Sequence, residues 1–307
     1  MVTLPTDGSV WMDGKLVPWT DANVHILTQS LHYGWAVYEG IRAHSLEARA
    51  GVFRLADHLR RLRDSARVYM MDVPYTDHEL TDAILEVVRA NNSGPCYIRP
   101  VVYLGHGSMG VALDLSLVRV AIASWPWDTR PQDATAAGGL RVMISGWQRN
   151  PDNCIPPLAK ATGGYINSSM AKIGAIQAGY DDALLLNESG RLAECSAANI
   201  FIVRSGVLYT PPVSEGILPG ITRDTVITLA TEAGLRVVER PITRAEAYTA
   251  DELFITGTAL GIAPVASVDD RATLTGPSGP VTRAILETYR DAVSGRHKER
   301  SSWITTI

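Results

Sequence analysis

Lys160 stands in a segment whose composition suits a buried and reactive amine. The segment is Ile155-Pro-Pro-Leu-Ala-Lys-Ala-Thr-Gly-Gly-Tyr165, with prolines before the lysine and two glycines after it. Prolines and glycines fix an irregular backbone just ahead of a predicted helix, and the small or apolar neighbours bury the lysine stem. Burial favours the neutral amine, which is the nucleophilic form. A lone lysine is usually solvated, but this context predicts a buried stem and an accessible nucleophilic amine.

Three further charged residues stand where the local pattern favours burial. Glu194 lies in strand-like surroundings, which glutamate fits poorly, and that misfit favours a functional carboxylate over a surface one. Arg99 interrupts the apolar run Tyr97-Ile-Arg-Pro-Val101 and suits bidentate pairing with an acidic group. Arg61 flanks the leucine stripe of a predicted helix, whereas a solvated arginine would lie on the opposite face.

A glycine-rich loop, Gly105-His-Gly-Ser-Met-Gly110, matches the dinucleotide-binding pattern GxGxxG and follows a predicted strand. A dinucleotide site also requires a helix directly after the loop and an acidic residue about 20 positions further on. The residues that follow the loop run into another strand instead. We therefore reject the dinucleotide interpretation and expect a loop that offers backbone N–H groups to a substrate carboxylate.

The elements that must position these residues fall into two predicted domains. In the first, the leucine stripe predicts a helix over residues 55–70, and the capping-box pair Thr76 and Glu79 predicts the start of a second helix. A hairpin signal at Asp13-Gly14 and runs of β-branched and aromatic residues predict the strands Ser9–Met12, Lys15–Pro18, Cys96–Leu104 and Val118–Trp125.

The polar, turn-rich stretch at residues 128–139 predicts a loop between a small α/β domain at 1–127 and a larger domain at 140–307. Helices of the larger domain are predicted at Ile166–Gln177, Thr222–Ala233 and Val281–Ala292. Its strands are predicted at Leu140–Ser145, Ala183–Leu186, Asn199–Val203, Val207–Tyr209 and Leu253–Thr256. Because strands and helices do not alternate strictly, the sequence predicts an α+β fold rather than a doubly wound sheet.

Composition narrows the class of protein. Of the 307 residues, 46% are hydrophobic and 20% charged, which permits a large core and argues against disorder. The net charge of −4 gives no reason to expect nucleic acid or an anionic membrane as partner. No apolar run approaches the roughly 18 residues that span a bilayer, and residues 1–8 lack the pattern of a secretory signal. The three cysteines, far apart and without a CxxC pair, indicate reduced thiols in a cytoplasmic protein, and the seven histidines show no metal-ligand spacing.

Several motifs occur together and in the order of one enzyme family. The lysine segment with Tyr165, Glu194-Cys-Ser-Ala-Ala-Asn199, Leu218-Pro-Gly-Ile-Thr-Arg223 and Thr256-Gly-Thr258 resemble the fold-type IV pyridoxal-phosphate enzymes. The N-terminal half agrees through Leu31-His-Tyr-Gly-Trp-Ala-Val-Tyr-Glu-Gly-Ile-Arg42, His58-Leu-Arg-Arg-Leu62 and Tyr97-Ile-Arg-Pro100. Within that fold the chain is most similar to branched-chain amino acid aminotransferases, from about residue 9 to about residue 270. The resemblance implies the two-domain fold shared by D-amino-acid and branched-chain aminotransferases, with the cofactor on the larger domain.

That resemblance implies pyridoxal 5′-phosphate as cofactor, an electron sink that the protein holds and tunes. Lys160 would carry it as a Schiff base and then move a proton between substrate and cofactor. Glu194 would pair with the pyridine nitrogen, and Tyr165 would donate to the phenolate oxygen of the ring. The phosphate would be bound by positive charge, by N–H groups at a helix start and by hydroxyls, from Arg61, Ile221, Thr222 and Thr258.

The resemblance also implies a substrate pocket and a partner subunit. The residues at positions that line the pocket in branched-chain aminotransferases are Tyr33, Tyr38, Gly40, Arg42, Tyr97, Arg99, Met109, Trp127 and Ala259. Gly40 and Ala259 would leave room for the substrate α-carboxylate and offer backbone donors. The loop Gly107–Val111, which holds Met109, would come from the other subunit of a homodimer.

The chain departs from the family pattern at three places. Asp128-Thr129-Arg130 follows Trp127 where small residues and a tyrosine are usual, Cys195-Ser-Ala-Ala replaces a glycine-rich stretch, and Trp35 is bulkier than the usual residue. These changes bear on the range of amino donors. The sequence predicts exchange of an amino group between an L-branched-chain amino acid and 2-oxoglutarate, in a ping-pong reaction through a pyridoxamine form.

Other functions compete with that prediction. The nearest are other enzymes of the fold: a D-amino-acid aminotransferase, an (R)-amine transaminase or an aminodeoxychorismate lyase, against which Arg42 and Arg99 argue. A nicotinamide-dependent dehydrogenase lacks the helix required after Gly110. A non-catalytic binding protein of the same fold would have no use for Lys160 and Glu194. Assays of L-, D- and (R)-amino donors discriminate among the enzymes.

Overall fold

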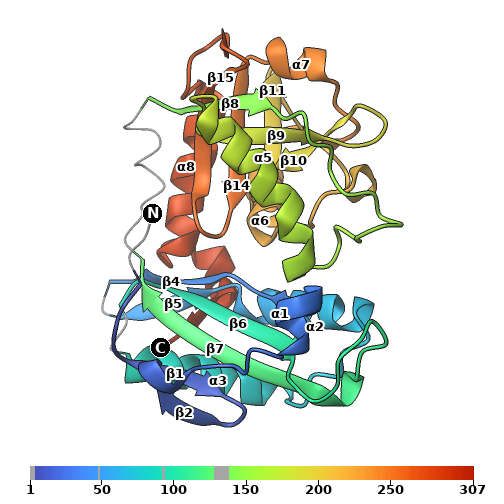
Figure 1. The fold of residues 1–307 in the computed structure, drawn as a ribbon. Helices are drawn as coiled ribbons and strands as arrows, with labels where there is room; N and C mark the ends of the chain where they lie inside the picture. The colour runs from blue at the N-terminus through green and yellow to red at the C-terminus, as the bar shows by residue number, and fades with distance from the viewer. Residues whose placement is uncertain (1–3, 48, 92–93, 128–137) are drawn as a thin grey trace. The chain divides into compact units, whose positions relative to one another are not determined.

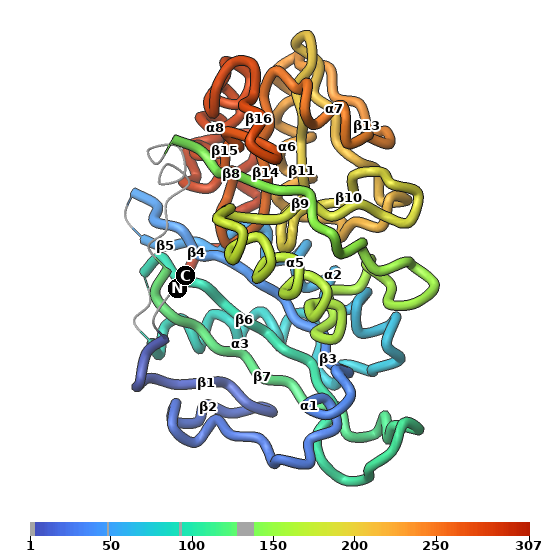
Figure 2. Tube along the Cα trace, turned by 45° about the horizontal axis from the view of Figure 1, so that its top comes forward, coloured from blue at the N-terminus to red at the C-terminus, as the bar shows by residue number. Residues whose placement is uncertain are grey.

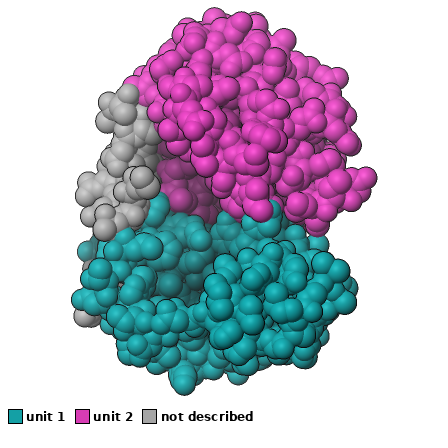
Figure 3. All heavy atoms as spheres, viewed as in Figure 1, with its two compact units in different colours: residues 1–128, 159–163, 292–307 teal, residues 129–158, 164–291 magenta. Residues whose placement is uncertain are grey.

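The computed structural model describes residues 4–47, 49–91, 94–127 and 138–307. Chain contacts divide it into two compact units, coloured separately in Figure 3. Unit 1 comprises residues 1–128, 159–163 and 292–307, and unit 2 comprises 129–158 and 164–291. The segments 159–163 and 292–307, which the sequence assigned to the second domain, therefore belong to unit 1. The predicted interdomain loop lies mostly outside the described residues.

Unit 1 is built on an antiparallel sheet (Figure 1). The strand order is β17-β5-β4-β6-β7-β1-β2, with β3 paired to β6. The strands are β1 (Ser9–Met12), β2 (Lys15–Pro18), β3 (Ala36–Tyr38), β4 (Ile41–Ser45), β5 (Ala50–Phe53), β6 (Cys96–Leu104), β7 (Val118–Pro126) and β17 (Ile304–Thr306). The predicted hairpin is confirmed: β1 pairs with β2, and Asp13 and Gly14 both have positive φ. Figure 2 shows the hairpin beside β7.

The two long helices of unit 1 show the features predicted from their sequences, a buried leucine stripe and a capping box. In α2 (Leu55–Val68), the predicted stripe of Leu55, Leu59 and Leu62 is buried. Before α3 (Asp77–Ala90), Thr76 and Glu79 form both bonds of a capping box, which satisfies N–H groups that the helix leaves open. Both helices pack against the sheet and each other. The short elements are α1 (Gln29–Tyr33), η1 (Trp19–Asp21), η2 (Leu115–Leu117), η3 (Thr162–Gly164) and η5 (Lys298–Trp303).

Unit 2 contains a mixed sheet in the order β10-β9-β8-β15-β14-β11-β12-β13, with β16 paired to β15. The strands are β8 (Leu140–Ile144), β9 (Asp182–Leu186), β10 (Leu192–Cys195), β11 (Asn199–Arg204), β12 (Val207–Thr210), β13 (Val237–Glu239), β14 (Glu252–Gly257), β15 (Gly261–Val268) and β16 (Arg271–Ala272). β8 runs parallel to β9 and β15, and β12 runs parallel to β13, whereas the other pairs are antiparallel. A mixed sheet of this kind confirms the predicted α+β class.

Helices pack on the unit 2 sheet and carry three of the predicted cofactor residues, Tyr165, Ile221 and Thr222. The helices are α5 (Tyr165–Gln177), α6 (Ile221–Glu232), α7 (Arg244–Tyr248), α8 (Pro280–Val293) and the short η4 (Val213–Glu215). Ala171 and Ala175 of α5 pack on Ala183 and Leu185 of β9, because small side chains allow a close approach. No helix in the described ranges is long and apolar enough to cross a membrane.

Candidate active site

Lys160 is fixed through its backbone to two elements of unit 1. Its N–H donates to Oγ of Ser65 on α2 at 3.0 Å, and its carbonyl oxygen accepts the N–H of Tyr38 on β3 at 3.0 Å. The side-chain Nζ then lies 4.7 Å from the centroid of the Tyr38 ring. This half-buried amine is therefore held in a defined place over an aromatic face, as a reactive group must be.

The glycines around Lys160 serve a close backbone contact. Gly163 donates its N–H to the carbonyl oxygen of Gly34 at 3.3 Å, and a Cβ on Gly34 would stand 3.1 Å from Cα of Gly163. Gly34 also has a φ of +65°, which glycine adopts without steric cost. Trp35, one of the sequence departures, donates its indole N–H to the carbonyl oxygen of Tyr69 at 3.0 Å and packs on that ring. Its bulk is thus accommodated beside α2.

Arg42, Tyr97 and Arg99 share one face of the unit 1 sheet. Arg42 of β4 and Tyr97 of β6 are cross-strand partners, and Tyr97 is also opposite Trp125 of β7. Cross-strand partners point to the same face, and so do residues two apart on a strand, such as Tyr97 and Arg99. The structure therefore brings together residues that the sequence predicted for the substrate pocket.

Arg99 lies among aromatic rings. Its Cζ is 4.6 Å from the centroid of Tyr38 and 5.3 Å from that of Tyr97, and one Nη donates to the hydroxyl of Tyr97 at a long 3.4 Å. Its Nε is buried and makes no hydrogen bond within the described part of the chain. A guanidinium held by ring faces, with hydrogen-bonding capacity left over, is suited to receive a carboxylate.

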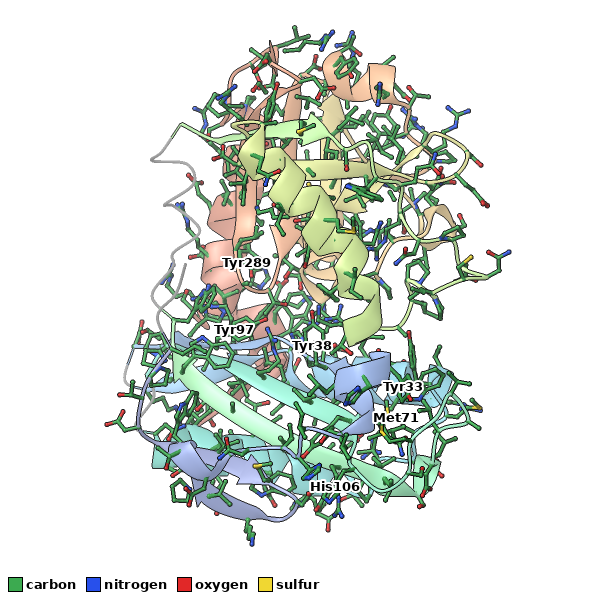
Figure 4. The ribbon with its side chains drawn as sticks, viewed as in Figure 1. Tyr33, Tyr38, Met71, Tyr97, His106 and Tyr289 are labelled. Carbon is green, nitrogen blue, oxygen red and sulfur yellow. The ribbon has the colours of Figure 1, made fainter. Side chains whose placement is uncertain are left out.

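Other predicted substrate residues of unit 1 also make defined contacts. A Cβ on Gly40 would stand 1.8 Å from the Tyr97 hydroxyl oxygen, so only glycine fits there. Arg42 donates to the carbonyl oxygen of Trp127 at 3.3 Å, and the rings of Trp127 and Tyr97 lie 5.0 Å apart. The hydroxyl of Tyr33 accepts the N–H of Gly110 at 3.1 Å. Figure 4 labels Tyr33, Tyr38 and Tyr97 on this unit.

Arg61 contacts a residue that the sequence analysis did not assign. Its Nε and one Nη donate to the two carboxylate oxygens of Glu39 at 2.6 and 2.9 Å, and Nδ1 of His58 lies 2.7 Å from the same carboxylate. Glu39 is fully buried. Burial by itself raises the pKa of Glu39, but the charges of Arg61 and His58 and their hydrogen bonds lower it well below its usual range. Burial also lowers the pKa of His58, so we assign Nδ1 as a donor to an ionised Glu39.

In unit 2, Glu194 is held by three donors. Its Oε1 pairs with one Nη of Arg149 at 2.7 Å, and its Oε2 accepts Nδ2 of Asn199 at 2.9 Å and the N–H of Leu218 at 3.1 Å. Arg149 is fixed in turn by the carbonyl oxygen of Gly216 at 3.1 Å. A guanidinium beside a buried carboxylate favours its charged form, and the predicted pairing with a pyridine nitrogen requires that form.

The predicted phosphate and ring contacts of unit 2 lie at the ends of its elements. Ile221 and Thr222 are the first residues of α6, whose N-cap Gly220 supplies no side-chain cap. A Cβ on Gly220 would stand 1.9 Å from Oδ1 of Asn199, so this helix start packs against the residue that holds Glu194. Thr258 and Ala259 lie in the turn between β14 and β15, and Tyr165 is the first residue of α5. Their roles stay predictions.

Other predicted features also have defined places. Met109 is half exposed on the loop after β6. That loop leads through the short 3-10 helix η2 into β7, so the α-helix that a dinucleotide site requires after the glycine motif does not follow it. In the departure Cys195-Ser-Ala-Ala, which connects β10 to β11, the hydroxyl of Ser196 donates to Asp182 at 2.6 Å. The departure Asp128-Thr129-Arg130 lies outside the described residues.

Sequence reasoning missed Glu39, Arg149 and Asn199 as site residues. Glu39 had a usable signal, since a carboxylate directly after the apolar run Ala36-Val37-Tyr38 is unusual in a strand. Asn199 stood in a quoted motif without a role. Arg149 lies in a polar loop after β8, and nothing in its neighbourhood distinguishes it from a solvated arginine.

Comparison with known proteins places this geometry in a family. The model of the amino-transferase class IV family matches residues 36–268. The branched-chain-amino-acid aminotransferase of Pseudomonas aeruginosa is 43% identical, over 98% of both chains. The crystal structure of a branched-chain aminotransferase from Thermoproteus uzoniensis with norvaline superposes with a TM-score of 0.93 at 44% identity, covering 98% of this chain and 99% of the other.

A second solved structure bears on the cofactor. The branched-chain amino acid aminotransferase of Thermobaculum terrenum, in its pyridoxal-phosphate holo form, superposes with a TM-score of 0.91 at 38% identity, covering 98% of each chain. Both the family model and these relatives span the strands, helices and turns that hold Lys160 and Glu194. The chain belongs to the class IV aminotransferases.

Proposed function

We propose that this chain transfers an amino group between the L-branched-chain amino acids leucine, isoleucine and valine and 2-oxoglutarate, with pyridoxal 5′-phosphate as cofactor. The observation that carries the proposal lies in unit 1. Nζ of Lys160 and Cζ of Arg99 are 4.7 and 4.6 Å from the centroid of the same Tyr38 ring. An amine suited to covalent catalysis and a guanidinium suited to a carboxylate thus contact one aromatic ring.

The donor set fits the cofactor. Lys160 offers the amine that would hold it, and Tyr165 and Glu194 would bind its ring. Oε1 of Glu194 is paired with Arg149 at 2.7 Å, and a neighbouring guanidinium favours the carboxylate form that a protonated pyridine nitrogen requires. Arg61, the start of α6 at Ile221 and Thr222, and Thr258 would bind the phosphate by charge, backbone N–H groups and a hydroxyl. Pyridoxal phosphate supplies an electron sink that stabilises negative charge on the substrate α-carbon.

The chain's own residues would position the substrate and move its proton. With substrate bound, Nζ of Lys160 would be the base that takes the α-proton. The backbone of Lys160 is anchored at both its N–H and its carbonyl, which helps to hold this amine in place. Gly40 and Ala259 would leave room for the α-carboxylate. Tyr38, Tyr97 and Trp127 would contact the apolar side chain of leucine or valine.

One pocket must accept both an aliphatic and an acidic side chain. When leucine is bound, an arginine without a partner in the pocket would be costly. The arginine that binds the acidic side chain therefore needs other contacts while an aliphatic substrate occupies the pocket. The rings of Tyr38 and Tyr97 meet that need for Arg99. When 2-oxoglutarate or glutamate binds, its distal carboxylate would gain a charge-assisted bond with Arg99.

We further propose a homodimer in which the 105–111 loop meets the partner's site. Six large apolar side chains near this loop are exposed: Val24, Ile26, Leu27, Leu31, Met109 and Val111. They are close in space, because the rings of His25 and His106 lie 4.8 Å apart and Gln29 donates to Ser108. Clustered exposed apolar residues of this kind are typical of protein interfaces.

A cytoplasmic location is proposed as well. Cys96, Cys154 and Cys195 are all free thiols, and two of them are buried. Burial raises the pKa of Cys96 to about 12 and that of Cys195 well above its usual value, so neither is a reactive thiolate. Free thiols that are far apart in the chain are typical of a reducing compartment.

Initial rates with a panel of amino donors test the reaction. L-leucine, L-isoleucine and L-valine with 2-oxoglutarate should give kcat/KM values at least about tenfold above those for D-alanine and (R)-1-phenylethylamine. A preference for a D-donor or an (R)-amine would overturn the proposal in favour of another enzyme of this fold. Release of pyruvate from aminodeoxychorismate would identify a lyase.

A further inference from the structure

Glu39 is a fully buried carboxylate that the reaction itself does not call for. It lies directly between Tyr38, which contacts Lys160, and Gly40, which contacts Tyr97. Both of its oxygens are engaged by Arg61, and one also by His58. A buried anion close to a residue that would bind a phosphate is unfavourable by simple charge repulsion. Its presence therefore needs a reason.

We propose that Glu39 is a positioning residue that locks the Arg61 guanidinium by its Nε edge and so directs its end-on edge at the cofactor phosphate. This inference rests on the proposed function, in which Arg61 binds that phosphate. Glu39 contacts Nε and one Nη, so its pairing uses one of the two forks of the guanidinium. The end-on fork, formed by the two Nη groups, is the one with which arginine binds a second oxyanion.

Positioning has a physical value here because arginine is long and flexible. Ordering its side chain costs rotamer entropy, and without Glu39 the phosphate contact alone would have to offset that cost. The two bonds to Glu39, at 2.6 and 2.9 Å, fix the guanidinium plane before any ligand arrives. Arg61 is also only 11% exposed, so the pair meets little competition from water.

Glu39 is itself held on several sides, as a positioning residue must be. Its N–H donates to the carbonyl oxygen of Pro100 on β6 at 2.9 Å, which fixes its backbone. His58 binds its Oε2 from α2, one turn before Arg61 on the same helix. The strand segment after β3 and the helix α2 are thereby tied together through one carboxylate.

The proposal distinguishes the phosphate from the rest of the cofactor. If Glu39 acts through Arg61 on the phosphate, its loss weakens binding of pyridoxal 5′-phosphate but not of pyridoxal, which lacks the phosphate. If Glu39 only supports the fold, its loss weakens both ligands alike. The ratio of the two dissociation constants is therefore a readout that a structural role leaves unchanged.

The experiment removes the cofactor from the purified holoenzyme and titrates the resulting protein with each ligand, following absorbance of the bound form. Glu39→Gln should raise Kd for pyridoxal 5′-phosphate about tenfold to a hundredfold, the range for a lost charged contact, and leave Kd for pyridoxal within about twofold. Glu252→Gln is the matched control, because Glu252 is another buried glutamate, bonded to the N–H groups of Val281 and Thr282. In Glu252→Gln, the ratio of the dissociation constants for pyridoxal 5′-phosphate and pyridoxal should equal that of the wild type.

Two further variants separate the inference from the function on which it rests. Arg61→Ala should change the ratio at least as much as Glu39→Gln does, and the double variant should change it no further than Arg61→Ala. An unchanged ratio in Arg61→Ala would overturn the phosphate role of Arg61 and the inference with it. If Arg61→Ala changes the ratio of dissociation constants but Glu39→Gln weakens binding of both ligands equally, the inference about Glu39 is overturned. The phosphate role of Arg61 then still holds.

Folding failure is covered by a second substitution. Glu39→Asp keeps the charge but withdraws the carboxylate by one methylene, so it cannot keep both bonds to Arg61 at their present lengths. If Glu39→Gln is recovered unfolded, as judged by circular dichroism, Glu39→Asp is titrated in its place. A selective loss of pyridoxal 5′-phosphate affinity supports the positioning role, and a ratio equal to the wild type refutes it.

Discussion

Lys160 and Arg99 lie against the same aromatic ring, that of Tyr38, although they are far apart in the chain. Nζ of the lysine is 4.7 Å and Cζ of the arginine 4.6 Å from the ring centroid. Tyr38 also donates its N–H to the carbonyl oxygen of Lys160, so the ring and the lysine backbone are fixed together. One tyrosine thus organises both the amine and the carboxylate-binding group of unit 1.

Replacing Arg99 should affect the two substrates unequally. We expect Arg99→Met to raise KM for 2-oxoglutarate about tenfold to a hundredfold, because a charged contact with the distal carboxylate is lost. KM for leucine or valine should change by less than about threefold, since those side chains meet the rings instead. Steady-state kinetics of both half-reactions provide the measurement. Equal losses for both substrates would mean that Arg99 supports the fold or binds the α-carboxylate.

Lys160 should be the residue that holds the cofactor covalently. Borohydride reduction of the holoenzyme, followed by peptide mapping, should place the label on Lys160. The next lysine in the chain, Lys172, is a natural control, because its Nζ is paired with Asp182 at 2.8 Å. A label on Lys172 would contradict the assignment, as would a protein that gives no label at all.

Glu194→Gln should lower turnover without unfolding the protein. The single amide oxygen can accept either from Arg149 or from Asn199 and Leu218, and the neutral amide cannot keep a pyridine nitrogen protonated. We expect kcat to fall by about a hundredfold or more, as for the loss of an electrostatic contact made in the transition state. Glu188→Gln, at an exposed turn, is the control and should retain wild-type turnover. If Glu194→Gln turns over at nearly the wild-type rate, the Glu194 carboxylate does not act on the cofactor ring.

His44 should make the fold less stable as the pH falls. Burial and the charge of Arg42 lower the pKa of His44 to about 3, whereas an unfolded histidine titrates near 6.5. Between these values the unfolded chain binds a proton that the folded protein does not, so the free energy of unfolding decreases as the pH drops below about 6.5. Glutamine cannot take up that proton. Chemical denaturation should therefore show a shallower loss of stability in His44→Gln than in the wild type from about pH 7 to pH 5, and parallel profiles would refute the prediction.

The exposed apolar side chains around the 105–111 loop should hold the dimer together. Val111 is 90% exposed and Met109 50% exposed. We expect Val111→Asp with Met109→Asp to shift the protein toward the monomer, because burying two carboxylates in an apolar contact is costly. Light scattering after size-exclusion chromatography measures the mass. Asp substitutions at the equally apolar but separate Val213 and Leu274, exposed on unit 2, are the control. If the protein with Met109→Asp and Val111→Asp remains a dimer, the interface does not lie at this loop.

Local patterns predicted much of the secondary structure. The Asp13-Gly14 turn, the capping box at Thr76 and the limits of β6 follow from neighbouring residues, and the structure confirms each of them. The sequence did not predict β15, Gly261–Val268, because it contains glycine, alanine and proline and is buried on both faces, so it shows no alternation. β17 was missed as well, since three residues near the C-terminus become a strand only by pairing with β5.

The sequence by itself indicated the candidate chemical groups: a lysine between prolines and glycines, an acid in strand-like surroundings, and an arginine inside an apolar strand. These follow from residue types and from neighbours within a few positions. Only the tertiary structure decided the partners. Glu39 meets Arg61 across 22 residues of chain, and Arg149 meets Glu194 from a loop with no distinctive pattern. Such pairs form because folding removes both charges from water, and a buried charge without an opposite charge beside it is unfavourable. Local periodicity in the sequence does not specify which residues will pair in this way.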